Sequence, residues 1–518
     1  MKRKIISMSV MIVVFVVLFC VIPPTYCYEE NPPKATDASQ SIETTEETKQ
    51  QIIEPTDDDK TESIIEETKV PLAEISATQT EPVKKQEENK ENTPSINENK
   101  PENNTQKEPE ETKPPKQETT PTEKTPTKRD MTLKGSFGFY KGSIPNSEIK
   151  EIHFQKEAPK NYQETWFANE SDSKHITGYR DGNVVYIVGD KIYANYRCNY
   201  MFAGKSRYDE PLWSGLEKIV GLENIDMSTA EKTSCMFYES PLKEINGIAN
   251  WNMSNVTSIE MMFSGCTELT HLDIANWDVS NVKDFSGVFQ GHSWASDMKF
   301  QYLDVSKWDT SSATEMNHVF YGCAQLKEIP IDNWDVSKVK TFSHMFADCN
   351  GVENLNFSKW NTASVQSFDA LLNDCHSLIT IDVSGLDTKT CTQYSQMFEA
   401  CINLEKIIGI ETWDVSNASY YAFSETFHCC YKLKELDLSA WKCKPDNIAR
   451  MFKNCYELKT VDMSGFDMSE LQHITEFATH CKQLAEIKGI ENWNMSIFTE
   501  ESRAFEDSLI VVQKEEIQ

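Results

Sequence analysis

The stretch that decides the fold is LTHLDIANWDVSNVKDFSGVF, residues 269–289, and a close copy, LKEIPIDNWDVSKVKTFSHMFADC, stands at residues 326–349. Each copy has a short alternating stretch, then a tryptophan, then a stretch rich in phenylalanine. The same phrase recurs throughout the second half of the chain. Recurrence at a fixed period indicates a repeat architecture, in which each unit packs mainly against its neighbours.

The period of the repeat can be measured on the aromatic anchor. The anchors are Trp251, Trp277, Trp308, Trp334, Trp360, Leu386, Trp413, Trp441, Phe466 and Trp493. Their successive spacings are 26, 31, 26, 26, 26, 27, 28, 25 and 27 residues. A Met-Phe pair such as Met345-Phe346 follows most anchors by 11 residues, and a cysteine often stands four residues after the Met. These coincident positions define one structural unit of about 26 residues.

Each unit contains two kinds of apolar spacing. Leu272 and Ile274 flank polar Asp273, which predicts a short strand with one buried face. After Trp251 the apolar residues have the spacing of one helix face, and Ser254 is the expected N-cap. These apolar residues are Val256, Ile259, Met262, Phe263 and Cys266. We therefore predict an α/β leucine-rich-repeat solenoid, with a parallel sheet on one side and short helices on the other.

The line L-x-x-L-x-I-x-x-W-x-V from Leu269 to Val279 resembles the leucine-rich repeat consensus, with Trp where Asn or Cys usually stands. With its NWDVSNV and MF-x-x-C motifs, the full phrase resembles the repeats of BspA-like leucine-rich repeat surface proteins over residues 191–505. The resemblance implies a surface protein that adheres to host or neighbouring cells.

Several copies depart from the repeat. Leu386 and Phe466 replace the anchor Trp, and the copy at residues 442–445 loses its helix start. Five extra residues between His292 and Trp308 introduce Trp294 out of register. Insertions gather on one edge of a solenoid, often the binding edge, so Trp294 is a candidate binding residue. A tolerated surface insertion is the alternative, because loops lengthen at little cost.

The rest of the chain divides by composition. Residues 1–27 have a basic start and an apolar run, which indicates an export signal or, as the alternative, an uncleaved membrane anchor. Residues 28–130 contain 26 acidic and 14 basic residues with many Pro and Thr, so we expect a disordered acidic stalk. A dispensable linker is the alternative. The protein is therefore expected to be exported, at the cell surface or secreted.

Residues 131–200 have the composition of a globular domain, and we expect them to cap the N-terminal end of the solenoid. Residues 182–190 and 191–193 predict two strands of this cap. The repeats are assigned to residues 201–505, and residues 506–518 form a C-terminal cap or tail. Within it, Leu509 to Val512 are expected to close the stack, because terminal repeats must differ from internal ones to stay soluble.

Cysteines recur at one phase of the repeat. The eight in this position are Cys266, Cys323, Cys349, Cys375, Cys401, Cys430, Cys455 and Cys481. Parallel side chains on stacked strands stay about 4.8 Å apart, farther than the ~3.8 Å between the Cβ atoms of a disulfide. We therefore expect buried free thiols that fill the core. Cys198, Cys235, Cys391, Cys429 and Cys443 lie off this line and are better disulfide candidates.

Charge indicates the class of partner. The net charge of −30 argues against nucleic acid and against anionic membranes as ligands. Five aspartates occupy one outward strand position: Asp273, Asp304, Asp382, Asp437 and Asp462. Carboxylates along a concave sheet could bind calcium or a basic protein, and these residues are the candidate site together with Trp294. The structural alternative is that they bond to neighbouring backbone groups.

The sequence offers no convergent catalytic constellation, so we do not expect an enzyme. Known hydrolase, metalloprotease and phosphate-loop motifs are absent, and no cofactor or metal is expected. His428 and His480 stand beside cysteines but are expected to face solvent. The function we expect is protein binding, as an adhesin. The alternatives are a self-associating structural surface protein and a small secreted hydrolase in residues 131–200.

Overall fold

The computed structural model describes residues 125–291 and 298–511. The expected signal or anchor (1–27) and nearly all of the expected stalk (28–130) therefore lie outside the described residues, as does Trp294. The described residues include no helix that is both long and apolar enough to cross a membrane.

A five-stranded sheet begins the described chain, in the order β2-β3-β4-β1-β6. Its strands are β1 (Glu151–Gln155), β2 (Glu164–Phe167), β3 (Thr177–Asp181), β4 (Val184–Val188) and β6 (Lys218–Val220). β4 and β5 (Ile192–Tyr193) fall where the sequence predicts strands. Because β1 pairs in parallel with both β4 and β6, this sheet extends past residue 200 into the first coil.

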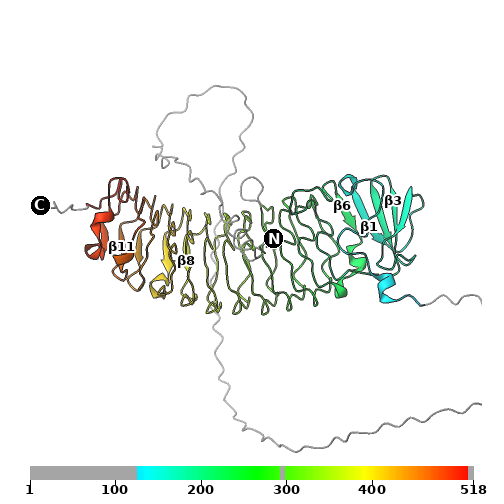
Figure 1. The fold of residues 1–518 in the computed structure, drawn as a ribbon, viewed down its shortest axis with the longest axis horizontal. Coiled ribbons are helices and arrows are strands. Elements are labelled where there is room, and N and C mark those ends of the chain that lie inside the picture. The colour runs from blue at the N-terminus through cyan, green and yellow to red at the C-terminus, as the bar shows by residue number, and fades with distance from the viewer. Residues whose placement is uncertain (1–124, 292–297, 512–518) are drawn as a thin grey trace, which may run out of the picture. The chain divides into compact units, whose positions relative to one another are not determined.

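Short parallel strands then link successive coils of the solenoid. They are β7 (Ile225–Asp226), β8 (Thr380–Asp382), β9 (Lys406–Ile408), β10 (Glu435–Asp437), β11 (Thr460–Asp462) and β12 (Glu486–Lys488). β5 pairs with β7, β8 pairs with β9, and β11 lies between β10 and β12 and pairs with both. Figure 1 shows the coils stacked in chain order from the first sheet towards β11. The predicted repeat solenoid with short parallel strands is confirmed as an architecture. Between β7 and β8, however, the described coils carry isolated bridges in place of strands, so the strand expected around Leu272 and Ile274 is not formed.

The predicted short α-helices are wrong. The helical elements in the described part of the chain are 3₁₀ turns of three or four residues: η1 (Lys128–Met131), η2 (Asn146–Glu148), η3 (Leu222–Asn224), η4 (Met227–Thr229), η5 (Ile410–Thr412), η6 (Met468–Glu470), η7 (Ile490–Asn492) and η8 (Met495–Ile497). Ser254 caps no helix, since its N–H donates to Asn252 Oδ1 at 3.1 Å. The Met-Phe segments are chains of turns instead.

Backbone hydrogen bonding explains why turns replace the helix. Met262 and Cys266 N–H donate to carbonyls three residues earlier, whereas Met261 and Phe263 N–H donate to Ser286 and Val288 of the next coil. An α-helix would satisfy all of these donors within itself and leave the coils unlinked. Left-handed residues at Met261 (φ 51°) and Gly265 (φ 70°) divide the segment into turns every four residues. The resulting apolar spacing imitates that of a helix.

The core is a set of side-chain ladders that run through the coils. Phe237 stacks on Phe263 at 5.5 Å between ring centroids, and Trp308 stacks on Trp334 at 6.2 Å. Anchor indoles also bond the preceding coil, as when Trp277 Nε1–H donates to the Ile248 carbonyl at 2.9 Å. The first sheet joins the same core, because Phe154 of β1 meets Phe202 edge to face and Phe202 stacks on Phe237.

Candidate functional site: an acidic groove on the strand face

The strand side of the coils presents two outward rows of side chains. In each coil a buried apolar residue, such as Leu303 or Ile381, separates one outward residue before it from one after it. The strands are short, so the outward rows lie close to the turns that follow. This geometry places Asp304 and Asp382 in one row, as the sequence predicts.

A groove of about 510 Å³ opens on these rows across four consecutive coils. Its charged lining residues are Asp304, Glu328, Asp332 and Asp382. Its uncharged lining residues are Tyr302, Ser306, Ile329, Pro330, Asn354, Leu355, Asn356 and Ser358. We call this surface the acidic groove, because none of the described residues that line it is a lysine, an arginine or a histidine.

The aspartates of the groove are held in fixed positions by local turns. Asp304 Oδ1 accepts from Ser306 N–H at 3.1 Å and from its hydroxyl at 2.7 Å. Asp382 accepts from Ser384 in the same way, at 3.0 and 2.6 Å. The serine bonds lower the pKa of both carboxyl groups, so both are ionised at neutral pH. The structural alternative for this row is therefore realised, and each carboxylate still has one oxygen outside these bonds.

The other predicted site residues lie outside the groove. Asp437 and Asp462 are register partners on β10 and β11. Asp462 also pairs with Lys488 at 3.3 Å, which neutralises part of that end of the row. Asp273 is exposed on an earlier coil. In the part of the chain that the structure describes, no group of His, Cys, Asp or Glu side chains is arranged to hold a metal ion.

Sequence reasoning missed most of the groove lining. Tyr302, half exposed at 52 %, and Glu328 come directly before the buried residues Leu303 and Ile329, whereas the prediction covered only the position after the buried residue. Asp332 lies in the turn that follows Ile331, and its Oδ1 accepts from Asn356 Nδ2 at 2.5 Å. Their signal in the sequence is the alternation itself, which also sends the residue before each buried position outward.

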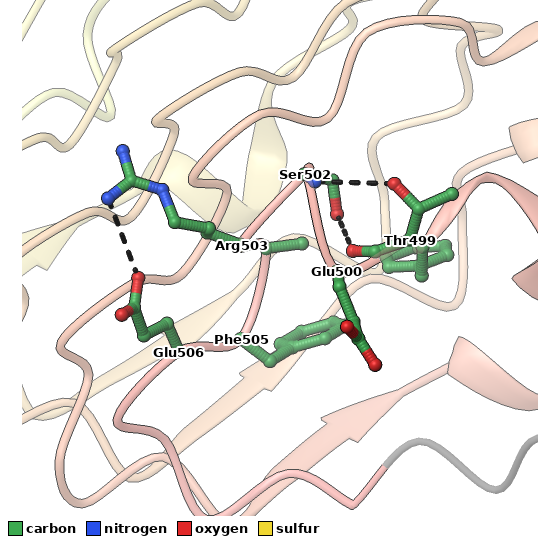
Figure 2. Close-up of a pocket in the computed structure, with 8 residues that line it drawn as sticks. Thr499, Glu500, Ser502, Arg503, Phe505 and Glu506 are labelled. Carbon is green, nitrogen blue, oxygen red and sulfur yellow. Dashed lines mark hydrogen bonds and ion pairs between the residues drawn. The ribbon is translucent and has the colours of Figure 1, made fainter.

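A second hollow, of about 430 Å³, lies at the last coil (Figure 2). Its polar groups bond largely to one another: Ser502 Oγ–H donates to the Thr499 carbonyl at 2.7 Å, and Arg503 pairs with Glu506 at 3.8 Å. Of the residues 509–511, which were expected to help close the stack, Ile510 packs against the core. Leu509 and Val511 are 60 % and 84 % exposed, although the Leu509 N–H donates to the Leu484 carbonyl.

All thirteen cysteines among the described residues are buried free thiols. The eight repeated thiols donate to carbonyls of the preceding coil, as when Cys375 Sγ–H bonds the Phe346 carbonyl at 3.2 Å. The prediction of core-filling thiols is confirmed for these eight. The suggestion of disulfides is wrong in this structure, because the five cysteines it names are all buried free thiols: Cys198, Cys235, Cys391, Cys429 and Cys443.

The two histidines beside cysteines differ from each other. His428 is buried and its Nδ1 lies 3.0 Å from Glu399 Oε1, so the prediction that it faces solvent is wrong. Burial raises the pKa of Glu399 to about 7. The reason for the error is the alternation of the turns, which directs the residue two before the cysteine inward. His480 remains partly exposed and pairs with Asp507 at 3.0 Å.

One protein family matches this chain over three successive stretches. Residues 197–299, 292–409 and 377–493 each match a family described as "Mycoplasma protein of unknown function, DUF285". No curated protein sequence gives a match. Among solved structures, a leucine-rich repeat protein from Bacteroides ovatus is 15% identical, covers 61% of this chain and 67% of its own, and has a TM-score of 0.28.

The functional domain of InlJ from Listeria monocytogenes, described as including a cysteine ladder, is also similar to this chain. It is 15% identical, covers 50% of this chain and 68% of its own, and has a TM-score of 0.13.

Proposed function

The chain belongs to the DUF285 family, whose repeats span more than half of it, and from that premise we propose that it is an exported, BspA-like surface protein that binds other proteins. The observation that carries the proposal is the acidic groove, whose described lining residues include four carboxylates and no basic side chain. Such a surface attracts a basic segment of a partner. Tyr302 and Pro330 supply apolar contact area beside the charges.

The buried thiols are compatible with export into an oxidising environment. Oxidants attack the thiolate, and its formation requires both a low pKa and access to solvent. Burial raises the pKa of Cys266 and Cys401 well above the usual range, and both side chains are fully buried. The folded chain therefore protects its cysteines without needing disulfides. We propose adhesion to host or neighbouring cells as the role, and binding rather than catalysis as the activity.

The test is capture of proteins from host and bacterial surface extracts, with a triple variant in the groove. Asp304→Asn, Asp332→Asn and Asp382→Asn together remove three charges, and Asn356 shows that asparagine keeps the serine turn, since its Oδ1 accepts from Ser358 N–H at 3.0 Å. We expect capture to fall at least about tenfold. It should also weaken as salt approaches about 1 M, where the Debye length is ~3 Å.

The matched control carries the same change of charge outside the groove. Asp278→Asn, Asp335→Asn and Asp414→Asn also affect aspartates that accept from a serine N–H. This variant should capture as much as the unmodified protein. Equal capture by the groove variant and the control would reject the groove as the binding surface.

A further inference from the structure

One position of the repeat, directly after the buried cysteine, carries a tyrosine in two successive coils. These residues are Tyr431 and Tyr456, and Lys482 has the same position in the next coil. Each tyrosine stands in the same tight turn, since Tyr431 N–H donates to the Cys429 carbonyl at 2.9 Å and Tyr456 N–H donates to the Asn454 carbonyl at 3.0 Å. The two side chains therefore leave their coils in the same direction.

The rings of the two tyrosines stack across the boundary between their coils. Their centroids are 4.8 Å apart, and the ring planes differ by 25°. A backbone bond fixes the register of the coils at this point, because Glu457 N–H donates to the Tyr431 carbonyl at 3.1 Å. Both tyrosines are half-buried, so each keeps part of its surface in contact with solvent.

This stacked arrangement distinguishes the pair from other tyrosine pairs in the described residues. The others in ring contact meet edge to face, with interplanar angles of 67°, 79° and 68°: Tyr162–Tyr179, Tyr200–Tyr238 and Tyr420–Tyr421. An edge-to-face pair directs the edge of one ring at the face of the other. Stacked rings instead bring equivalent carbons of the two phenols opposite each other.

The lysine of the following coil covers the remaining face of the second tyrosine. Lys482 Nζ lies 5.5 Å from the centroid of the Tyr456 ring. Because Lys482 belongs to the coil after Tyr456 and Tyr431 to the coil before it, the cation lies over the face turned away from Tyr431. The pair is thus closed on this side and forms a unit of two phenols.

The cysteines that precede the tyrosines do not compete with them for oxidants. Burial raises the pKa of Cys430 and of Cys455 well above the usual range of a thiol. The thiolate is the form that oxidants attack, and buried protonated thiols are inert. The phenols are therefore the oxidisable groups at this place on the surface.

We propose that Tyr431 and Tyr456 are a modification site, at which hydrogen peroxide used by a haem peroxidase joins the two rings as dityrosine. Each phenol loses one electron and the proton of its hydroxyl. The two radicals form a carbon–carbon bond between their ortho positions, and the hydrogens displaced there move to the oxygens and restore both phenols. One molecule of hydrogen peroxide takes up the two electrons and two protons and becomes two molecules of water.

The bond would act as a covalent staple between adjacent coils. It closes the chain between residues 431 and 456, and such a closure restricts the unfolded chain as a disulfide does. The modified protein should therefore have a higher Tm than the unmodified protein. The site is separate from the acidic groove, and its test does not depend on the proposed function.

The experiment treats the dilute full chain with hydrogen peroxide and a haem peroxidase, and N-acetyltyrosine oxidised in parallel shows that the reagents are active. Dityrosine fluorescence of the monomer fraction measures the yield, and mass spectrometry of proteolytic fragments locates the bond. We expect the bond between Tyr431 and Tyr456 to be the main product within one molecule. No dityrosine in the protein, or a greater yield at the more exposed Tyr420 and Tyr421, would overturn the proposal.

Variants assign the product to the stacked pair. Tyr431→Phe keeps the stacked ring but has no hydroxyl to oxidise, so the yield within one molecule should fall at least about tenfold, because an oriented neighbour reacts far faster than a distant one. Its Tm before oxidation should be unchanged. Tyr420→Phe, in the exposed edge-to-face pair, is the matched control and should react as the unmodified protein does. An equal loss in both variants would contradict a site defined by stacking.

Discussion

Left-handed residues at the turn side are the smallest features that make this fold possible. Most coils have two of them four residues apart, such as His344 and Asp348 or Ala370 and Asp374. For residues other than glycine this conformation costs about 1 kcal/mol, and it persists only where surrounding contacts enforce it. The stacked backbone bonds between coils provide that enforcement. The strain is repeated along the stack because each coil must match the next.

Two glycine positions allow the free-energy cost of a left-handed backbone to be measured separately from the cost of a steric clash with the facing coil. Gly322 has φ +71°, and an added Cβ would stand 3.2 Å from Gly291 Cα, whereas Gly182 has φ +58° with open space around it. We expect Gly182→Ala to lower the free energy of unfolding by about 1 kcal/mol. Gly322→Ala should cost about 2 kcal/mol or more, since backbone atoms of the facing coil must also move.

Chemical denaturation monitored by circular dichroism measures both values. Equal costs for the two glycine variants would show that packing between the turns tolerates a methyl group.

Among the larger elements, an ionic ladder joins the last coils on the turn side. Glu476 accepts from Arg450 Nε at 2.9 Å, from Lys453 Nζ at 3.0 Å and from Arg503 Nη2 at 2.5 Å. Although burial opposes ionisation, the bonds from Arg450 and Lys453 lower the pKa of Glu476 to about 2. One carboxylate thus connects side chains from three coils.

The ladder predicts a pH-dependent stability for the last coils. A carboxyl pKa that folding lowers contributes stability above its unfolded value of about 4.3, and this contribution is lost as the pH falls towards about 2. Glu476→Gln should therefore lower the free energy of unfolding by about 1–2 kcal/mol at pH 7, and the difference should shrink below pH 3. Thermal unfolding at both pH values measures it.

Glu506→Gln serves as the control for the ladder, because Glu506 is exposed and its ion pair with Arg503 is long, at 3.8 Å. It should change stability little at either pH. A pH-independent difference for Glu476→Gln would mean that lost packing, rather than lost charge, causes its effect.

At the scale of the whole molecule, the buried thiols make the solenoid sensitive to alkali. Burial raises the pKa of Cys198 and of Cys266 to about 12, whereas an unfolded thiol titrates near about 8.5. Above that pH the unfolded chain releases protons that the folded chain keeps, so stability falls as the pH rises. Each such thiol contributes a slope of up to ~1.4 kcal/mol per pH unit.

Urea unfolding between pH 7 and pH 10.5 tests this expectation. The free energy of unfolding of the unmodified protein should fall steeply as the pH rises. For Cys266→Ala its slope against pH should be shallower by the contribution of one thiol. A folded protein whose stability does not change over this range would contradict burial of the thiols. Reaction with a thiol reagent should likewise be slow until the chain unfolds.

The sequence by itself determined the repeat, its period and its core. Trp334, Phe346 and Cys349 recur in register because each must fill the same place in every coil, so their burial could be inferred from spacing alone. The outward position of Asp304 and Asp382 followed from strand alternation. These inferences depend only on local periodicity, which a single sequence carries.

Only the tertiary structure decided how the coils bond to one another, and this is where the sequence was misleading. Turns with a period of four residues and a helix with a period of 3.6 bury nearly the same positions, but the turns direct alternate N–H groups to the next coil. The acidic groove joins Tyr302 to Asp382 across four coils. Contacts between coils depend on stacking register, which the spacing within one repeat does not specify.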